Sequence, residues 1–326
     1  MKNHHMSYTP PFNISAQIVH LIADISAQTE RYAIRMEQQD GLLLRKINRI
    51  KTIQGSLAIE GNTLSEQMIT EILDGKTVVA PVREIQEVKN AIKTYDAFNE
   101  LSPYKIDDML KAHGMMMNAL VDDAGHFRQG GVGVFSGIEA VHIAPPANRV
   151  PYLMADLFEW LKKSKDHLLI KSCVFHYEFE FIHPFSDGNG RLGRLWQSLI
   201  LNQLHPLFAH LPVENMVFQN QQRYYDAIGE STAASDSQVF IEFMLNEILD
   251  TLKNRQGAEL STNDTVNDTV NDIVNLIKTN QKITIDEIAV ALNKSKSTIS
   301  RKIKQLQDDE VIARVGSDKS GHWAVT

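Results

Sequence analysis

Residues 183–194 read HPFSDGNGRLGR, and no other stretch of the chain constrains its structure as tightly. Pro184 lacks an N–H group and disfavours helical backbone at His183, so a helix arriving from the N-terminal side is expected to end there. The glycines that follow allow a tight loop that turns back into a second helix. The pattern predicts two helices, over about 168–182 and 190–204, joined by a polar loop.

The polar loop contains groups that bind phosphate. Backbone N–H groups at a glycine-bearing helix N-terminus form an anion site, and here they would come from Gly188, Asn189 and Gly190. Arg191 and Arg194 lie three residues apart, so both project from one side of the first helical turn. Two guanidinium groups beside a cluster of N–H groups suit a polyphosphate.

Two further side chains add a cation ligand and a base. Asp187 offers carboxylate oxygens, and Mg²⁺ is usually held by one or two carboxylates together with substrate phosphates. His183 can act as a base near neutral pH and accept a proton from a hydroxyl group. These groups lie within one short stretch, which predicts phosphoryl- or nucleotidyl-group transfer. The spacing of His176, Glu180 and His183 would also suit a zinc triad, but Pro184 explains His183 better, and His176 fits a packed helix residue.

The stretch matches HPFxxGNGRxxR, the motif of Fic-domain proteins, at every fixed position. The segments HYEFEF (176–181) and VHIAPPANRVP (141–151) are also similar to that family, and the resemblance covers about residues 50–230. It implies a mainly α-helical Fic core with a β-hairpin flap. It also implies a nucleotidyltransferase, namely a protein adenylyltransferase. Such an enzyme uses Mg²⁺ and ATP to transfer AMP to a Ser, Thr or Tyr hydroxyl of a target protein.

The resemblance gives each residue of the loop a role. His183 would deprotonate the target hydroxyl, whose oxygen attacks the α-phosphate and releases pyrophosphate. Asp187 would hold Mg²⁺ on the α- and β-phosphates, and the N–H groups of residues 188–190 would form the anion hole. Arg191 would support the β-phosphate and Arg194 the γ-phosphate. Related kinases have Ala and Lys in the glycine stretch, so the glycines present here favour AMP transfer over phosphate transfer.

A second motif lies N-terminal to the first. Residues 56–61 read SLAIEG and place Ser56 and Glu60 four residues apart, on one face of a helix. The segment resembles the inhibitory motif [S/T]xxxE[G/N] of autoregulated Fic proteins. The resemblance implies that Glu60 pairs with Arg194, takes the place of the γ-phosphate and leaves ATP in an unproductive pose. In some relatives this glutamate orients a water that removes AMP, so the reverse reaction stays an open alternative.

Two further segments are expected to border the site. Residues 128–148 are rich in glycine and β-branched residues, which predicts a β-hairpin. By resemblance this hairpin is a flap in which Val141, His142 and Ile143 hold the target by strand-like backbone pairing. Tyr225, in the segment RYYDAIG, resembles the residues that border adenine in the family. A half-buried aromatic helix face is the alternative for Tyr225.

The 326 residues are expected to form two domains, and a hydrophobic content of 43% allows a sizeable core. A small polar segment with a four-residue repeat (NDTV, NDTV, NDIV) is the best candidate for a domain boundary. We expect an N-terminal helical region at 1–105 with the inhibitory helix, a Fic catalytic core at 106–256, a linker at 257–270 and a winged-helix domain at 271–326.

The tail has the pattern of a winged helix. A helix-turn-helix is followed by two short apolar runs, VIARV and HWAVT, around a glycine-bounded loop. Residues 288–307 contain five basic residues and no acidic one, which suits contact with DNA. The net charge of −7 argues against general nucleic-acid binding, so protein positioning or homodimer assembly is favoured over DNA binding.

The remaining composition bounds the location of the protein. Cys173 is the lone cysteine, so no internal disulfide is expected, which fits a reducing compartment. No run of about 18 apolar residues and no leader-like segment is present, so the expectation is a cytoplasmic protein without a membrane partner. The expected partners are ATP and a target protein, with the chain itself as one candidate target. The alternatives are a winged-helix DNA-binding regulator with the Fic domain as a nucleotide-sensing switch, or transfer of another nucleotide, such as UTP or GTP.

Overall fold

The chain forms two compact units, residues 1–253 and 254–326, and each is considered by itself. The computed structural model describes residues 8–38, 41–136, 139–253, 273, 276–277, 280–281, 283–292, 296–308, 312–315 and 322–325. The linker expected at 257–270 lies outside the described residues.

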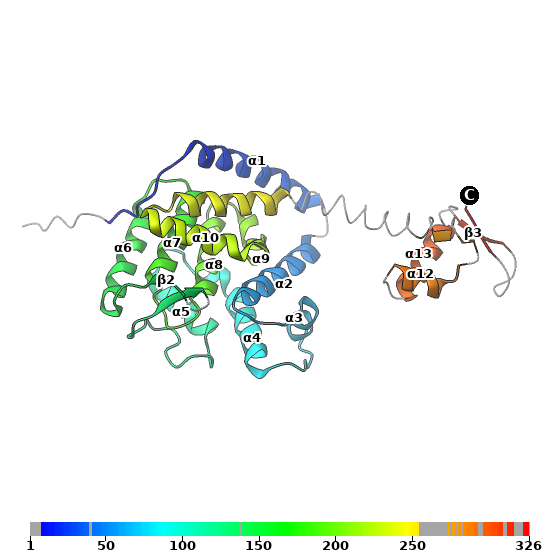
Figure 1. Cartoon of the computed structure of the whole chain (residues 1–326), viewed down its shortest axis with the longest axis horizontal. Helices are drawn as coiled ribbons and strands as arrows, with labels where there is room; N and C mark the ends of the chain where they lie inside the picture. The colour runs from blue at the N-terminus through cyan, green and yellow to red at the C-terminus, as the bar shows by residue number, and fades with distance from the viewer. Residues whose placement is uncertain are drawn as a thin grey trace, which may run out of the picture. The chain divides into compact units, whose positions relative to one another are not determined.

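The larger unit is mainly helical, as the sequence predicted (Figure 1). Its α-helices are α1 (Ala16–Gln38), α2 (Gly41–Ile59), α3 (Glu66–Leu73), α4 (Val82–Asp96), α5 (Ile106–Met116), α6 (Val150–Lys163), α7 (Leu168–Ile182), α8 (Asn189–Asn202), α9 (Val213–Gln219), α10 (Gln221–Ala234) and a final helix over 238–253. Three short 3-10 segments complete it: η1 (Phe98–Glu100), η2 (Ala147–Arg149) and η3 (Pro206–His210).

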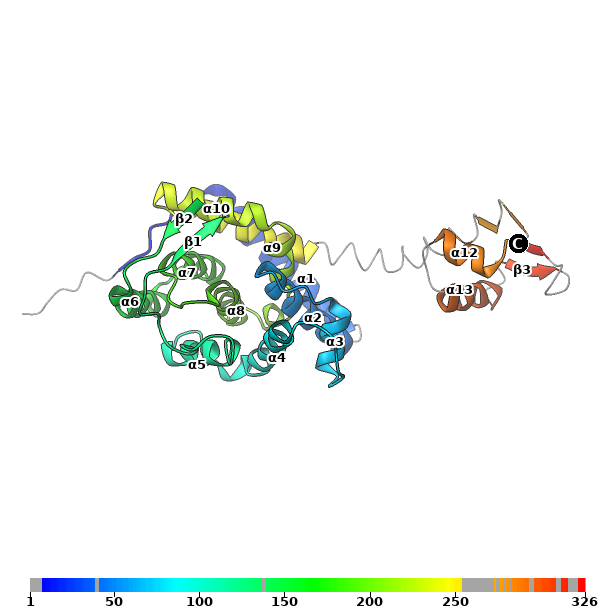
Figure 2. The same cartoon turned by 60° about the horizontal axis from the view of Figure 1, so that its bottom comes forward.

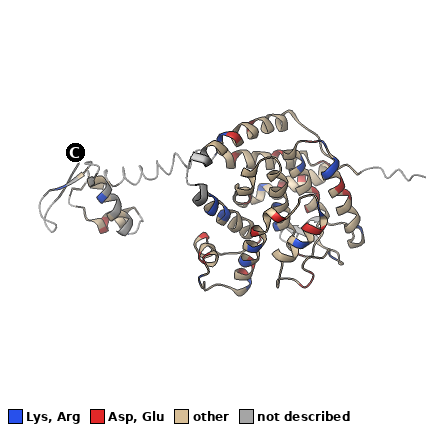
Figure 3. Ribbon diagram, turned by 180° about the vertical axis from the view of Figure 1, so that it is seen from behind, with Lys and Arg blue, Asp and Glu red and all other residues tan. Residues whose placement is uncertain are grey.

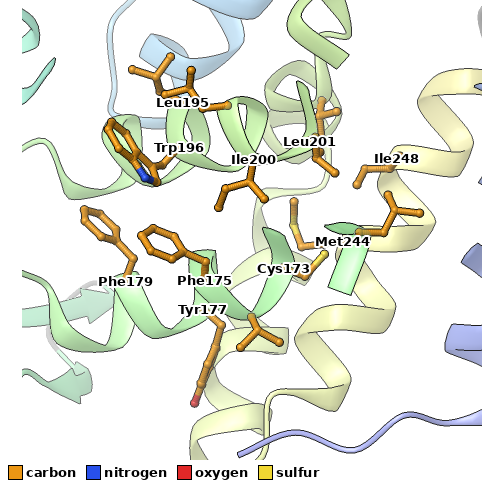
Figure 4. Packing of buried hydrophobic residues seen from close by; sticks show 14 of the residues in the cluster. Cys173, Phe175, Tyr177, Phe179, Leu195, Trp196, Ile200, Leu201, Met244 and Ile248 are labelled. Atoms are coloured by element: carbon orange, nitrogen blue, oxygen red, sulfur yellow. The ribbon is translucent and has the colours of Figure 1, made fainter. Parts of the chain in front are cut away.

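Helices α7 and α8 form the centre of this unit. The residues of α7 from Leu169 to Phe179 are all buried, and a helix covered on every side is expected to be hydrophobic all round. Phe175 and Phe179 face Trp196 and Ile200 of α8 across the core (Figure 4). Burial of each such side chain contributes about 1.5–3 kcal/mol. Close apolar packing therefore fixes the two helices that flank residues 183–188.

Helix α1, which the sequence analysis placed in a separate N-terminal region (1–105), shares this core. Ile18 and Ile25 of α1 belong to the same buried cluster as α7 and α8. The segment before α1 is tied to the final helix, because Ser15 donates a hydrogen bond to Glu242 (2.6 Å). Figure 2 shows α1 alongside the last helices of the unit.

Helices α2, α3 and α4 have a small core of their own, formed by Ile53, Leu57, Ile69 and Val88 with their neighbours. Basic residues recur along α2, and two of them form ion pairs with its neighbours (Figure 3). Lys46 pairs with Asp74 after α3, and Arg49 pairs with Asp96 at the end of α4. Both pairs are exposed enough to be worth little individually, so apolar packing holds α2 in place.

Two strands, β1 (Gly133–Ser136) and β2 (Glu139–Ile143), run antiparallel where the sequence predicted a hairpin. Gly133 lies opposite Ile143 and Val134 opposite His142, with an irregularity before Phe135. Strand β2 lies against α10.

The smaller unit contains α12 (Ile285–Ala291), α13 (Lys296–Asp308), β3 (Ile312–Val315) and β4 (His322–Val325), with β3 and β4 antiparallel. Thr284 caps α12 reciprocally with Glu287: each backbone N–H donates to the other side chain, at 3.2 and 2.8 Å. Its core is formed by isoleucines of both helices and Trp323. Among the described residues of the whole chain, no helix is long and apolar enough to cross a membrane.

Candidate active site

Helix α7 ends at Ile182, as the sequence predicted, and His183 is the first residue of the loop that follows. His183 adopts the left-handed conformation (φ 49°), and its N–H still donates to Phe179 O at 2.9 Å. Its ring Nδ1 lies 3.3 Å from the carbonyl oxygen of Glu180. Donation from Nδ1–H to that carbonyl puts the lone pair on Nε2, the nitrogen that can accept a proton from a substrate.

The loop after His183 is closed by its own side chains. Asn189 brackets Phe185, accepting from its N–H and donating to its carbonyl oxygen, both at 2.9 Å. Gly188 has φ 81° and precedes the first residue of α8, so a glycine is needed there. The side chain of Asn189 is fully used inside the loop, which leaves its backbone N–H as the group that can meet an anion.

Two buried residues that the sequence analysis missed hold this loop. The guanidinium of Arg128 donates to the carbonyl oxygens of His183 (2.7 Å), Gly130 (2.8 Å) and Pro145 (2.5 Å). Arg128 therefore joins both ends of the hairpin segment to the end of α7. A lone arginine in a glycine-rich stretch gave no signal of this role.

His113 of α5 is the second support. Its Nδ1 accepts from Gly125 N–H (2.8 Å), so Nε2 carries the proton and donates to Asp187 O (3.0 Å). The ring stacks on Phe185 at 3.8 Å between centroids. Burial lowers the pKa of His113, and the neutral ring is the form these bonds require.

Both arginines of the motif are buried, and each meets a carboxylate. Arg191 lies 3.2 Å from Asp187 and 3.7 Å from Glu87 of α4. Arg194, whose side chain is 3% exposed, donates to Glu60 at 2.9 Å. Burial opposes the charge of Arg194, but Glu60 and its other neighbours outweigh it and leave the pKa raised.

The geometry around Glu60 follows from how α2 ends. Gly61 has φ 90° and turns the chain just after the helix, which leaves Glu60 facing Arg194. Arg194 also donates to the backbone oxygen of Ser56 (2.9 Å) and to its hydroxyl (3.3 Å). A Cβ atom at Gly190 would lie 2.6 Å from the Glu60 carboxylate, so the glycine leaves the space that this carboxylate fills.

A buried polar cluster lies behind the loop. His176 binds Gln197 through Nδ1 (2.6 Å) and Tyr224 through Nε2 (3.0 Å), and burial lowers its pKa to about 4. These bonds favour the packed role for His176. Among the described residues, no group of three or more His, Cys, Asp or Glu side chains is arranged to hold a metal ion. Burial raises the pKa of Glu180 to about 8, with Arg194 acting against the shift and Glu60 for it.

Similarity to known proteins agrees with this geometry. The family model described as Fic/DOC family matches residues 103–201. The crystal structure of a Fic family protein from Desulfovibrio desulfuricans G20 is 42% identical, with a TM-score of 0.74, and covers 98% of each chain. The chain belongs to the Fic/DOC family. A winged helix-turn-helix DNA-binding model also matches residues 266–313, so this Fic protein has a C-terminal winged helix.

Among the curated relatives of this Fic chain is the protein adenylyltransferase Fic of Nematostella vectensis, 29% identical over 205 residues. That match covers 59% of this chain and 45% of the relative. Fic-1 (aa134 - 508) from C. elegans shares the fold at 20% identity, with a TM-score of 0.59, over 76% of this chain and 74% of that one. The chain spans less than half the length of the curated relatives it matches.

The remaining predicted site residues lie near the loop or outside the described side chains. Tyr225 is half-buried, and Gln221 lies between it and α2, with its amide 3.5 Å from the Tyr225 hydroxyl and donating to Ile59 O at 3.1 Å. Val141, His142 and Ile143 lie on β2, but only their backbone is described.

The residues present fit the cation that the family implies. The Asp187 side chain is 41% exposed at the loop surface, with one oxygen toward Gly188 N–H and Arg191 and the other toward Arg83 at 3.5 Å. One accessible carboxylate beside an anion site suits Mg²⁺, which completes its octahedron with phosphate oxygens and water.

Proposed function

We propose that this Fic protein is a protein adenylyltransferase, which transfers AMP from ATP to a Ser, Thr or Tyr hydroxyl of a target protein and is inhibited by Glu60. One observation carries the proposal. His183, the N-terminus of α8 and both motif arginines converge on one loop, and Glu60 fills the space beside Gly190 and Arg194. The names of the curated relatives support the same activity.

In this mechanism, Nε2 of His183 removes the proton from the target hydroxyl. The hydroxyl oxygen forms a bond to the α-phosphorus, and the bond from that phosphorus to the bridging oxygen breaks, so pyrophosphate leaves with the electron pair. Backbone N–H groups at Gly188, Asn189 and Gly190 hold the charge that develops on the α-phosphate. Arg191 and Arg194 bind the β- and γ-phosphates. Mg²⁺ held by Asp187 would supply further neutralisation of phosphate charge.

Inhibition follows from competition for Arg194. A carboxylate bound to this guanidinium at 2.9 Å occupies the partner that the γ-phosphate needs. ATP then binds without its γ-phosphate anchor, and the α-phosphate is not aligned with His183. Ser56 supports the inhibited state by accepting from the same guanidinium.

The target segment is expected to pair with the backbone of β2 through residues 141–143, beside the mouth of the loop. Tyr225 is expected to border the adenine, because it lies half-buried next to the end of α2 and near Glu60. Backbone pairing depends little on the side chains of the target, so the sequence of the flap does not specify the sequence of the target. The chain itself is one candidate target.

DNA binding by the winged helix is a second candidate function, favoured by the description of the matching model. One basic residue of α13, Lys296, forms an ion pair with Asp286 at 2.8 Å, which reduces the positive charge of that helix. We therefore favour a protein-positioning or dimer-forming role for this unit. A salt-sensitive DNA footprint would reverse that order.

The test is the intact mass of the protein after incubation with Mg²⁺ and ATP, for Glu60→Gly and for Glu60→Gly/His183→Ala. We expect AMP units on the first chain, fewer on wild type and none on the double variant. Replacement of ATP by GTP or UTP tests the base, and loss of AMP from modified protein after nucleotide removal tests the reverse reaction. Equal labelling of wild type and Glu60→Gly would remove the inhibitory role of Glu60.

A further inference from the structure

Arg191 has fewer hydrogen-bond partners among the described residues than Arg194, the other motif arginine. Its side chain is 4% exposed, and its Nε is buried without a hydrogen-bond partner among the described residues. A planar guanidinium in such a site needs a carboxylate to balance its charge and to fix its direction. The structure offers two, Asp187 at 3.2 Å and Glu87 at 3.7 Å.

Asp187 is poorly suited to hold Arg191 during the reaction. Its side chain is 41% exposed, and the oxygen near Arg191 also accepts the Gly188 N–H at 2.6 Å. In the proposed function this carboxylate also ligates the cation. Glu87 would then be the carboxylate left to Arg191.

Glu87 is placed for that task by the loop that carries the inhibitory residue. Its side chain is 12% exposed, and its Oε2 accepts from the amide of Asn62 at 2.9 Å. Its Oε1 faces Arg191 and, at 3.5 Å, Arg83. Asn62 lies two residues after Glu60, so one short loop reaches both motif arginines: Arg194 directly, and Arg191 through Glu87.

We propose that Glu87 is the positioning residue of Arg191, and that its carboxylate, oriented by Asn62, holds the guanidinium at the β-phosphate position. The proposal rests on the proposed function in one respect, namely that ATP phosphates occupy the loop. It predicts that Glu87 affects ATP only through Arg191.

Glu84 provides a matched control. It lies one turn earlier on α4 and binds the same loop, accepting from Thr63 N–H (2.6 Å) and from its hydroxyl (2.8 Å). Its carboxylate makes no ion pair with Arg191 among the described residues. A purely structural role of the α4 contacts would therefore appear equally in Glu84→Gln and Glu87→Gln.

The experiment measures ATP affinity by titration calorimetry with Mg²⁺ present, in the Glu60→Gly chain so that Arg194 is available. Glu87→Gln keeps the size of the side chain and its bond to Asn62 but removes the charge. We expect it to weaken ATP binding about tenfold, a loss typical of one charged contact. Glu84→Gln should change the affinity less than twofold, and Glu87→Gln should add nothing to Arg191→Ala.

Any of these results would overturn the proposal: an equal loss in Glu84→Gln, an undiminished effect of Glu87→Gln in the Arg191→Ala chain, or tighter ATP binding in Glu87→Gln, which would make Glu87 a competitor of the phosphate. Absence of ATP binding in the Glu60→Gly chain would overturn it too, because Arg191 would then hold no phosphate. A Glu60→Gly chain that binds ATP without transferring AMP would instead contradict the proposed function and leave this test intact.

Discussion

The proposed catalytic loop at 183–190 and the proposed inhibitory loop at 60–62 both lie beside Arg194, but they are held in different ways. The catalytic loop is fixed from several sides by buried groups, including the guanidinium of Arg128 and the stacked ring of His113. The inhibitory loop reaches it through a carboxylate that is still 32% exposed. Under the proposed function, this difference corresponds to a preformed catalytic site whose access to ATP depends on an exchangeable polar contact.

The largest expected effect separates chemistry from structure in the catalytic loop. His183→Ala should lower AMP transfer by about 10²–10⁴-fold or more, because the base is lost. The contacts of Arg128 use the backbone oxygen of His183, so the loop should keep its fold. The rate is measured with labelled ATP in the Glu60→Gly chain, and an unchanged melting temperature serves as the control. A substantial residual rate would show that another group accepts the proton.

The next effect tests whether the catalytic loop is truly preformed by Arg128. Arg128→Ala leaves several buried carbonyl oxygens without donors, and we expect about 2–4 kcal/mol of lost stability together with lost activity. Urea unfolding measures the change. Arg149→Ala, at an exposed arginine after the hairpin, is the matched control and should cost less than about 0.5 kcal/mol. Equal effects of the two substitutions would contradict the supporting role of Arg128.

The third effect concerns Glu180 of α7, whose carboxylate lies 3.8 Å from Nδ1 of His183. Its pKa is raised to about 8 by burial, so over the range from its ordinary value to 8 the folded chain keeps a proton that the unfolded chain releases. The contribution of this carboxyl to the free energy of unfolding is therefore full at low pH, and it is lost as the pH rises through that range. Glu180→Gln removes the titration and should gain stability relative to wild type on going from pH 5 to pH 8.

The relative stability should change by up to about 1.4 kcal/mol per pH unit within that range, and a shift of about 2–4 °C in melting temperature corresponds to about 1 kcal/mol for a unit of this size. Glu100→Gln, at an exposed position of η1, should show no such pH-dependent difference. A parallel pH dependence of wild type and Glu180→Gln would indicate that the carboxyl is ionised in the folded chain.

The comparison also shows how far sequence alone reaches. The end of α7 and the start of α8 were predictable because Pro184 and the glycines act on the local backbone. The approach of Glu60 to Arg194 was expected from the resemblance of two short motifs, and the structure brings the two together. In both cases the prediction came from short stretches in which the informative residues are close together in the sequence.

Arg128, His113 and Glu87 were not predictable in the same way. Each acts through tertiary contacts with residues far away in sequence, and none lies in a pattern that separates it from an ordinary helix or loop residue. A buried arginine that binds carbonyl oxygens and an exposed arginine have the same sequence signature. The residues that support the site could therefore be identified only from the packed structure, whereas the residues proposed to react could be identified from the sequence.

The most direct test of the account compares the affinities of ATP and ADP for wild type and for Glu60→Gly. If Glu60 takes the place of the γ-phosphate on Arg194, wild type should bind the two nucleotides with nearly equal affinity. Glu60→Gly should then prefer ATP by about tenfold or more, since a charged contact is regained. The same ATP-to-ADP ratio in both chains would contradict the claim that Glu60 and the γ-phosphate compete for Arg194.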